Sequence, residues 1–420
     1  MFIFDEAQAI MRFAVATYGT EGDTRPMAAL CRALMDAGHE ARLLADHATL
    51  GTASALGVPS IPLAGDIKGM LQREHAISSV VAERRGFSSM ASALAHIANM
   101  HAEAWLREIV RAGEDCDAII VSGLAAFVGL SAAEHLGVKA IGTGLIPITP
   151  TKAFASPFLP PKWIPTFLNY ASQSLVNQML WRAFREKTNA ARAAVCGLPP
   201  RRELWTRHPM LYGISPSLIA RPDDWPDNAR MCGQWLPPTA DWVAPQTLTD
   251  FLAAGDPPIY IGFGSMAGFD PQRVLGEMIA AVAGRRALFY PGWSGADIST
   301  LPPNFHVIGD TPHAWLFPQT SLVIHHGGSG TSHSAARAGV PSVVVPFAGD
   351  QSFWADRLRR AGVAGAALNG RKLRASVLAE SIEDAGRAEM RSRARDLGLK
   401  MQSENGLRNA VIAIETMMNK

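Results

Sequence analysis

The chain has 420 residues, more than one hydrophobic core usually supports, so two domains of about 200 residues each are expected. Hydrophobic residues make up 48% of the sequence, and 39 basic and 37 acidic residues give a formal net charge of +2. This near balance excludes the strong positive field of a general nucleic-acid-binding protein, so no nucleic-acid partner is expected and any anionic ligand must be held locally.

The N-terminus and the cysteines favour a cytoplasmic protein. The first ten residues, "MFIFDEAQAI", contain two acidic residues and no basic stretch, unlike a signal peptide, and we interpret them as an extension ahead of a start at Met11. The four cysteines stand singly, without the paired spacing of a zinc site or a disulfide framework. No apolar run reaches the roughly 18 residues that a transmembrane helix needs.

Strands and helices alternate through the first half of the chain. "RFAVATY" (Arg12 to Tyr18) predicts a strand, and "PMAALCRALMDAG" has its apolar residues at helical spacing and stops at Gly38. "EARLLAD" predicts a second strand, and "DAIIVSG", "LSAAEHLG" and "KAIGTGL" repeat the pattern. The loop "GTEGDTRP", between the first strand and the first helix, carries Asp23, for which helix capping is the common role.

The segment from Pro147 to Phe184 departs from this alternation. It concentrates proline and aromatic residues and then becomes an amphipathic helix. One interpretation is a helical hairpin packed on the sheet. The other is an apolar acceptor pocket or a membrane-surface patch, because exposed aromatic side chains need something to cover them. The aromatic residues expected to be exposed are Phe154, Phe158, Trp163 and Phe167.

A Pro- and Trp-rich stretch from Arg221 to Gln246 separates this half from a second series of strands. We interpret it as an interdomain linker, since so long a loop is uncommon inside a compact domain. The strands that follow are "PIYIGFGSM", "RRALFYPG", "NFHVIG", "SLVIHHG" and "PSVVVPF". Strands that alternate with helices predict parallel sheets, so the fold class is α/β with two doubly wound domains. The predicted boundaries are 11–235 for the first domain, 236–246 for the linker, 247–400 for the second domain and 401–420 for a C-terminal helix.

The stretch "SLVIHHGGSGTSH" (Ser321 to His333) places a glycine turn between a strand and a helix. Such a turn exposes unpaired backbone N–H groups at the helix N-terminus, which favour a phosphate. Glycine turns also occur in α/β proteins without any ligand, and this one is neither a P-loop nor a standard dinucleotide fingerprint. The diphosphate interpretation assigns close backbone approach to Gly327, Gly328 and Gly330, and hydrogen-bond donors to Ser329 and Thr331.

Two further pairs of polar residues lie beside that turn. His326 can donate a hydrogen bond to a phosphate oxygen, whereas His325 should point to the opposite face of the strand and is expected to be a packed residue. Asp350 and Gln351 follow the next strand at the carboxyl edge of the sheet, where a carboxylate beside an amide suits sugar hydroxyls. The commoner role of such an aspartate is to cap the following helix.

"HHGGSGTSHSAARAGVPSVVVPFAGDQSFWADRLRRAGV" closely resembles the donor-binding signature of GT-B glycosyltransferases of the UDP-glycosyltransferase superfamily, family 1. "ATYGTEGDTRPMAALCRAL" resembles the N-terminal motif of the same family, and the likeness runs from about Met11 to Gly362. The nearest branches are the bacterial antibiotic glycosyltransferases and the sterol 3-beta-glucosyltransferases. The resemblance implies two facing Rossmann-like domains, with the acceptor in the first and the nucleotide sugar in the second. It also implies that the C-terminal helix crosses back to the first domain, although from the sequence alone packing on its own domain is equally good.

Individual roles follow from the resemblance by motif match. In the antibiotic branch the residue that matches Asp23 is the proposed general base, and a helix N-terminus is expected to depress the pKa of this carboxyl and keep it ionised. The histidine that serves the plant branch is missing from that loop, which leaves the base assignment open. The residues implied for the diphosphate are His326, Gly328, Ser329, Gly330, Thr331 and, from another strand end, Ser265. Asp350 and Gln351 are implied for the sugar. Trp293 is implied for the nucleobase, and the alternative at that position is a tryptophan packed in the core.

The resemblance implies an inverting transferase that moves a hexose, with glucose favoured, from a UDP-sugar to a hydroxyl of a lipophilic molecule such as a sterol, polyketide, macrolide or flavonoid. No cofactor or metal is expected, because no metal-binding D-x-D motif stands at a strand end. The alternatives are a transferase that uses a dTDP-deoxysugar, a nucleotide-sugar-binding accessory protein without activity, and a GT-B sugar epimerase. Peripheral membrane association is left open by the aromatic segment.

Overall fold

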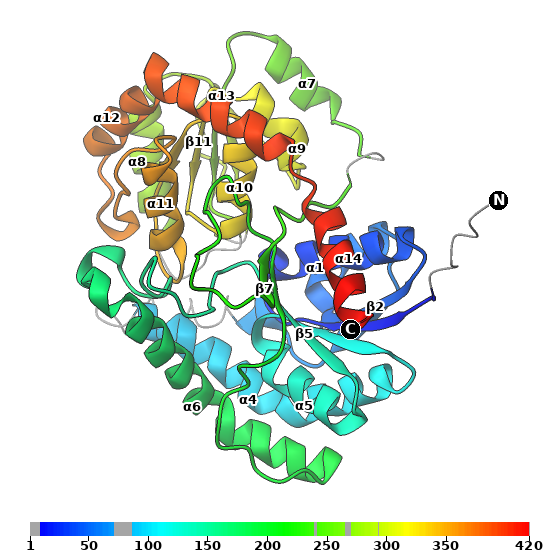
Figure 1. Ribbon diagram of the computed structural model, residues 1–420. Helices are drawn as coiled ribbons and strands as arrows, with labels where there is room; N and C mark the ends of the chain where they lie inside the picture. The colour runs from blue at the N-terminus through cyan, green and yellow to red at the C-terminus, as the bar shows by residue number, and fades with distance from the viewer. Residues whose placement is uncertain (1–8, 71–85, 239–241, 265–269, 293, 420) are drawn as a thin grey trace, which may run out of the picture.

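The computed structural model describes residues 9–70, 86–238, 242–264, 270–292 and 294–419, without the side chains of residues 86–93 and of residue 162. Two parallel sheets form two lobes, one from each half of the chain, and helices surround both sheets (Figure 1). This arrangement confirms the predicted α/β class with two doubly wound domains.

The N-terminal sheet has seven strands in the order β3-β2-β1-β4-β5-β6-β7, all pairing in parallel. Strand β1 lies between β2 and β4, so the chain turns from one side of the sheet to the other at this point. The carboxyl ends of strands at such a switch point are where open α/β folds bind ligands. The strands are β1 Arg12–Ala16, β2 Glu40–Asp46, β3 Ser60–Leu63, β4 Ala118–Val121, β5 Lys139–Gly144, β6 Met210–Tyr212 and β7 Ala229–Met231.

The two faces of this sheet are covered by different helices. In β1, Phe13 and Val15 face one hydrophobic cluster while Ala14 and Ala16 face another, as the alternation of a strand requires. The first cluster includes α1 and α14, and the second includes α4 and α5. The helices of this lobe are α1 Glu21–Asp36, α2 Gly51–Ala55, α4 Gly86–Gly113, α5 Ala126–Leu136 and α6 Asn169–Cys196, with short 3₁₀ turns η1 His47–Thr49, η2 Gly123–Ala125, η3 Pro161–Trp163 and η4 Thr166–Leu168.

Helix α1 begins earlier than its apolar pattern predicts. Its first residue is Glu21, so Asp23 lies in the first helical turn and not in a loop before the helix. A capping box explains the early start: the Thr20 side chain accepts from the backbone of Asp23, and the Asp23 side chain accepts from the backbone of Thr20. The "GTEGDTRP" motif is thus the strand-to-helix junction itself.

The aromatic segment after β5 is only partly exposed. Trp163 and Phe167 are 78% and 82% exposed, as expected. The prediction for Phe154 is wrong, since it is 5% exposed and packs on Phe353 of the C-terminal lobe with ring centroids 5.4 Å apart. Burial here depends on the other lobe, which the local pattern cannot show.

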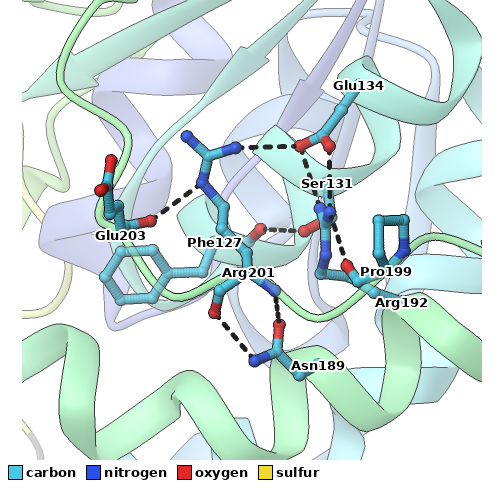
Figure 2. Close-up of polar contacts among 8 residues, drawn as sticks. All are labelled: Phe127, Ser131, Glu134, Asn189, Arg192, Pro199, Arg201 and Glu203. Atoms are coloured by element: carbon cyan, nitrogen blue, oxygen red, sulfur yellow. Dashed lines mark hydrogen bonds and ion pairs between the residues drawn. The ribbon is translucent and has the colours of Figure 1, made fainter.

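Helix α6 is fixed to α5 by charged side chains (Figure 2). Arg192, whose side chain is 1% exposed, makes two hydrogen bonds of 3.0 Å to the carboxylate of Glu134 in α5. Arg201 lies 3.5 Å from the same carboxylate and exchanges backbone hydrogen bonds with the side chain of Asn189. A bidentate guanidinium–carboxylate pair with one buried partner sets the orientation of both helices.

The C-terminal sheet has five strands in the order β10-β9-β8-β11-β12, and these also pair in parallel. Its order reverses between β8 and β11, which is therefore the switch point of this lobe. The strands are β8 Ile259–Gly262, β9 Ala287–Tyr290, β10 Phe305–Val307, β11 Leu322–His325 and β12 Ser342–Val344. The helices are α7 Gln246–Ala253, α8 Pro271–Val282, α9 His313–Leu316, α10 Ser329–Arg337, α11 Gln351–Arg360, α12 Ala375–Ala385 and α13 Ala388–Gln402, with η5 Phe317–Gln319 and η6 Gly370–Lys372.

The last helix, α14 (Gly406–Met418), lies on the N-terminal lobe (Figure 1). Ala410, Val411 and Ile414 belong to the same hydrophobic cluster as the buried face of α1. The Lys139 ammonium donates to the backbone carbonyls of the last turn at 2.9 Å. A second apolar cluster contains residues of both lobes, including Phe154, Tyr212 and Trp225 from the first and Phe353, Trp354 and Leu358 from the second.

Candidate functional site

The glycine turn lies at the switch point of the C-terminal sheet, directly after β11. Gly328 is the N-cap of α10, and neither a side-chain cap nor an acidic residue in the first turn neutralises this helix end. The first helical hydrogen bond runs from the Ser332 N–H to the Gly328 carbonyl at 2.9 Å. The N–H groups of Ser329, Gly330 and Thr331 therefore come before the first hydrogen bond of the helix. With the helix dipole, these groups form an environment suited to an anion.

His326 is enclosed by glycines from neighbouring strand ends. A Cβ atom on Gly328 would lie 2.4 Å from its Nε2, and one on Gly264, after β8, would lie 3.3 Å from its Cε1. Its Nδ1 is buried and has no hydrogen-bond partner among the described residues. Burial lowers the pKa of His326 to about 4, so near neutral pH this imidazole is uncharged and can donate one hydrogen bond.

His325 and the hydroxyl of Ser329 are engaged within the protein. His325 is fully buried, as expected, and its Nδ1 accepts from the Gly327 N–H at 3.1 Å. The Ser329 hydroxyl donates to the Leu145 carbonyl, after β5, at 2.8 Å. This hydroxyl therefore joins the turn to the N-terminal lobe, and the donor that Ser329 has left for a ligand is its backbone N–H.

Asp350 and Gln351 lie at the start of α11, beyond the end of β12. Asp350 occupies the N-cap position, yet its carboxylate accepts from the indole N–H of Trp354 at 2.6 Å instead of capping the helix. The Gln351 side-chain oxygen accepts from the backbone N–H groups of Phe347 and Ala348 at 2.7 and 3.0 Å. Gln351 thus shapes the loop that carries Asp350.

Asp23 follows β1, at the switch point of the N-terminal sheet. The backbone N–H and the hydroxyl of Thr20 donate to its Oδ2 at 2.8 and 3.2 Å. The hydrogen bonds that it accepts from described residues thus end on one oxygen. Burial raises the pKa of Asp23 above its ordinary value despite these two bonds, so the expected depression by the helix terminus is wrong. Desolvation of this carboxyl therefore outweighs the two local donors.

The two lobes bring the two acidic groups close enough to interact. Burial, the largest cause, and the Asp23 carboxylate both raise the pKa of Asp350, which lies at about 6 although the Trp354 N–H lowers it. Beside them, the guanidinium of Arg25 lies 2.5 Å from Asp310 of the C-terminal lobe and 3.0 Å from Glu21 of its own helix. Asp23, the turn and Asp350 therefore belong to one interlobe site.

Sequence reasoning missed His333, which connects three parts of this site. His333 is 1% exposed, its Nδ1 lies 2.8 Å from the Ser329 carbonyl, and its Nε2 accepts from the Ser215 N–H of the N-terminal lobe at 3.2 Å. Its ring also packs edge-on against Trp354, which holds Asp350. A histidine four residues after Ser329 on a helix was a visible signal, but its partner in the other lobe was not.

Ser265 and Trp293 lie outside the described residues, so their roles stay predictions. Within the described part of the chain, no three His, Cys, Asp or Glu side chains gather in a way that could hold a metal ion. Of the helices described, none is long and apolar enough to cross a membrane.

Comparison with known proteins shows which proteins this chain resembles. Residues 273–407 match the model of the "Erythromycin biosynthesis protein CIII-like, C-terminal domain". The chain is 32% identical over 428 residues to the sterol 3-beta-glucosyltransferase of Glomerella lagenarium, which covers 96% of this chain and 28% of that protein. It is also 32% identical to the sterol 3-beta-glucosyltransferase of Emericella nidulans, over 98% of this chain and 31% of that protein. The chain thus spans less than a third of the length of these relatives.

Solved structures share the fold along almost the whole chain. The glycosyltransferase of kitacinnamycin superposes with a TM-score of 0.70 at 18% identity, covering 98% of this chain and 100% of that one. The glycosyltransferase VinC, solved in complex with dTDP, superposes with a TM-score of 0.68 at 18% identity, covering 97% and 99%. At this identity the likeness establishes the two-lobed fold.

Proposed function

We propose that this chain is a glycosyltransferase of the UDP-glycosyltransferase superfamily and that it transfers a hexosyl group from a nucleoside diphosphate sugar to a hydroxyl of a lipophilic small molecule. The observation that carries the proposal is the interlobe site. An uncapped helix N-terminus with His326 beside it faces two acidic side chains, Asp23 and Asp350, whose pKa values are both raised. One side suits a diphosphate and the other suits hydroxyl groups.

In this proposal the N–H groups of the turn hold the diphosphate and stabilise its charge as it leaves. His326 adds a neutral donor, and the helix dipole adds partial positive charge. Because these donors are fixed before the reaction, they need no rearrangement when charge develops. We expect the reaction to need no metal ion, so activity should persist in the presence of a chelator.

Asp23 is proposed as the general base. The acceptor oxygen forms a bond to C1 of the sugar as its proton passes to the free carboxylate oxygen of Asp23. The bond between C1 and the diphosphate oxygen breaks, and its electron pair leaves with the nucleoside diphosphate. Attack opposite the leaving group inverts the anomeric centre. A raised pKa makes the carboxylate a better proton acceptor than an ordinary exposed aspartate.

Two classes of nucleotide sugar are candidates for the donor. A UDP-hexose, with glucose first, is supported by the sterol 3-beta-glucosyltransferase relatives and by Asp350, a carboxylate that can accept from sugar hydroxyls in addition to the Trp354 N–H. A dTDP-sugar is supported by the match to the erythromycin biosynthesis domain and by the structural neighbour solved with dTDP. The acceptor is proposed to be a sterol-like or polyketide-like alcohol.

The experiment is calorimetric titration with UDP, UDP-glucose, dTDP and dTDP-glucose, for wild type and His326→Ala, followed by nucleotide-release assays with and without lipophilic alcohols. Donor binding that weakens in the variant, with nucleotide release only when acceptor is present, supports the transferase. Donor binding without transfer to any alcohol would favour the accessory protein. Absence of nucleotide binding would contradict the proposal.

A further inference from the structure

Helix α6 buries several polar side chains together with Trp181 and Ala191, and it also exposes several apolar side chains. Its buried residues include Ser172, Gln173 and Arg192, all at most 7% exposed. Its exposed residues include Leu175 at 59% and Met179 at 58%. A surface helix normally buries its apolar stripe, so this distribution indicates that something apolar covers the outside.

Some of the exposed apolar residues lie along one side of α6, whereas Tyr170 and Leu180 are exposed at other positions of the helix. Leu168, Leu175 and Met179 are spaced by seven and four residues, which puts them on one side of the helix. Trp163 and Phe167, in the two short turns just before α6, add the most exposed rings of the segment. We call these five residues the outer face of α6, and Figure 1 shows this helix along the outside of the N-terminal lobe.

The segment that carries this face is basic up to Arg185, although Asp224 lies beside Lys152 and accepts from its backbone N–H at 2.8 Å. From Pro147 to Arg185 the sequence contains basic residues but no Asp or Glu. Lys152, Arg182 and Arg185 are exposed, and the first acidic residue, Glu186, pairs with Lys187 at 3.7 Å. An apolar face with a basic border is complementary to a surface that is apolar inside and anionic at its edge.

We propose that the outer face of α6 docks the protein on an anionic lipid bilayer, with Trp163, Phe167, Leu175 and Met179 inserted at the headgroup level and the basic side chains on acidic headgroups. Interfacial helices bind through this combination of aromatic and aliphatic side chains with Lys and Arg. A second copy of the chain fits less well, because a two-fold interface would bring the same basic residues of both copies together. This proposal goes beyond glycosyl transfer and does not depend on it.

The test is co-sedimentation of the full chain with vesicles of phosphatidylcholine, with and without phosphatidylglycerol. Wild type should bind the anionic vesicles, and salt should weaken the binding. Leu175→Ser combined with Met179→Ser should lower the partition coefficient about tenfold or more, because two apolar anchors are lost. Arg182→Gln with Arg185→Gln should lower it on anionic vesicles only. The matched controls are Leu399→Ser and Arg391→Gln, at exposed positions of α13 in the other lobe, which should bind as wild type does.

Phe167→Ser tests the same face without risk to folding, since an 82% exposed side chain supports little of the fold. This variant should also bind anionic vesicles more weakly. Failure of wild type to bind anionic vesicles, or unchanged binding by the α6 variants, overturns the proposal. So does a dimer in solution that the Leu175→Ser, Met179→Ser variant loses, because the face would then cover a second copy. Nucleotide titration of the same variants separates this result from the proposed function, because donor affinity should stay at the wild-type value.

Discussion

Asp23 has a structural role and, in the proposed function, a catalytic one. Its Oδ2 closes the first turn of α1 through the Thr20 hydrogen bonds, as helix capping predicts. The same residue lies at the end of β1, opposite the C-terminal lobe, where burial raises its pKa. The sequence could indicate either role from the position after the strand. It could not indicate the direction of the pKa shift, because the burial of this carboxyl depends on the folded structure.

Replacement of Asp23 by asparagine separates the two roles. The amide oxygen can still accept from Thr20, so the helix start and donor binding should survive, whereas turnover should fall by about 10² to 10⁴ because the proton acceptor is gone. Steady-state rates with a saturating lipophilic acceptor, and calorimetry for the donor, are the measurements. Asp36→Asn, at the exposed end of the same helix, is the control and should leave both unchanged. Wild-type turnover in Asp23→Asn would remove Asp23 as the base.

At the scale of elements, the strands were the most predictable part of the fold. β2 runs from Glu40 to Asp46, the bounds of the run "EARLLAD", and all four of its apolar residues are buried. The start of α1 was less predictable, since it depends on a capping box and not on apolar spacing. Phe154 was mispredicted because its partner, Phe353, lies in the other lobe.

Alanine substitutions at Gly328, the N-cap of α10, and at Gly330, within the helix, should have different effects on stability. A Cβ on Gly328 would meet His326 at 2.4 Å, whereas a Cβ on Gly330 would meet no atom within 4 Å. Gly328→Ala should therefore lower stability by about 1 to 2 kcal/mol through overpacking. Gly330→Ala should raise it by up to about 0.5 kcal/mol through helix propensity. Both should weaken donor binding, because a diphosphate over the turn needs the space above each Cα.

Urea unfolding and nucleotide titration of the two alanine variants together test whether a diphosphate binds over this turn. A turn that is only structural would show the stability changes without any change in nucleotide affinity. Unchanged affinity in Gly330→Ala, in particular, would argue that no phosphate lies over that residue.

For the whole molecule, the buried histidines govern how stability depends on pH. Burial lowers the pKa of His333 from 6.5 to about 4 and that of His325 well below 6.5. Below pH 6.5 the unfolded chain protonates these imidazoles while the folded chain leaves them neutral, so their contribution to stability falls as the pH drops. Asp350 acts in the opposite sense, because its pKa is raised to about 6 and its protonation favours the folded state in acid. His208, His313 and His326 shift in the same direction as His333.

The lowered pKa values of these five histidines outweigh the raised pKa of Asp350, so the free energy of unfolding should decrease from pH 7 to pH 4.5. The midpoints of urea unfolding across this pH range measure the decrease. His208→Gln removes one of the histidines at a position that packs against Gly142, away from the turn, and should make the slope shallower. Stability that stays level or rises toward pH 4.5 would contradict the assigned shifts.

The return of α14 to the N-terminal lobe also determines the order in which this protein can be completed during synthesis. Met27, Leu30 and Leu34 on α1 emerge from the ribosome early, but the Val411 and Ile414 side chains that share their cluster are made only after the whole second lobe. The first lobe therefore waits for the entire second lobe before its surface closes, and a nascent chain released before α14 would leave an apolar face for chaperones or aggregation. Chimaeras that exchange the C-terminal half at the linker inherit the same dependence, because the incoming half must bring a last helix that fits the resident α1.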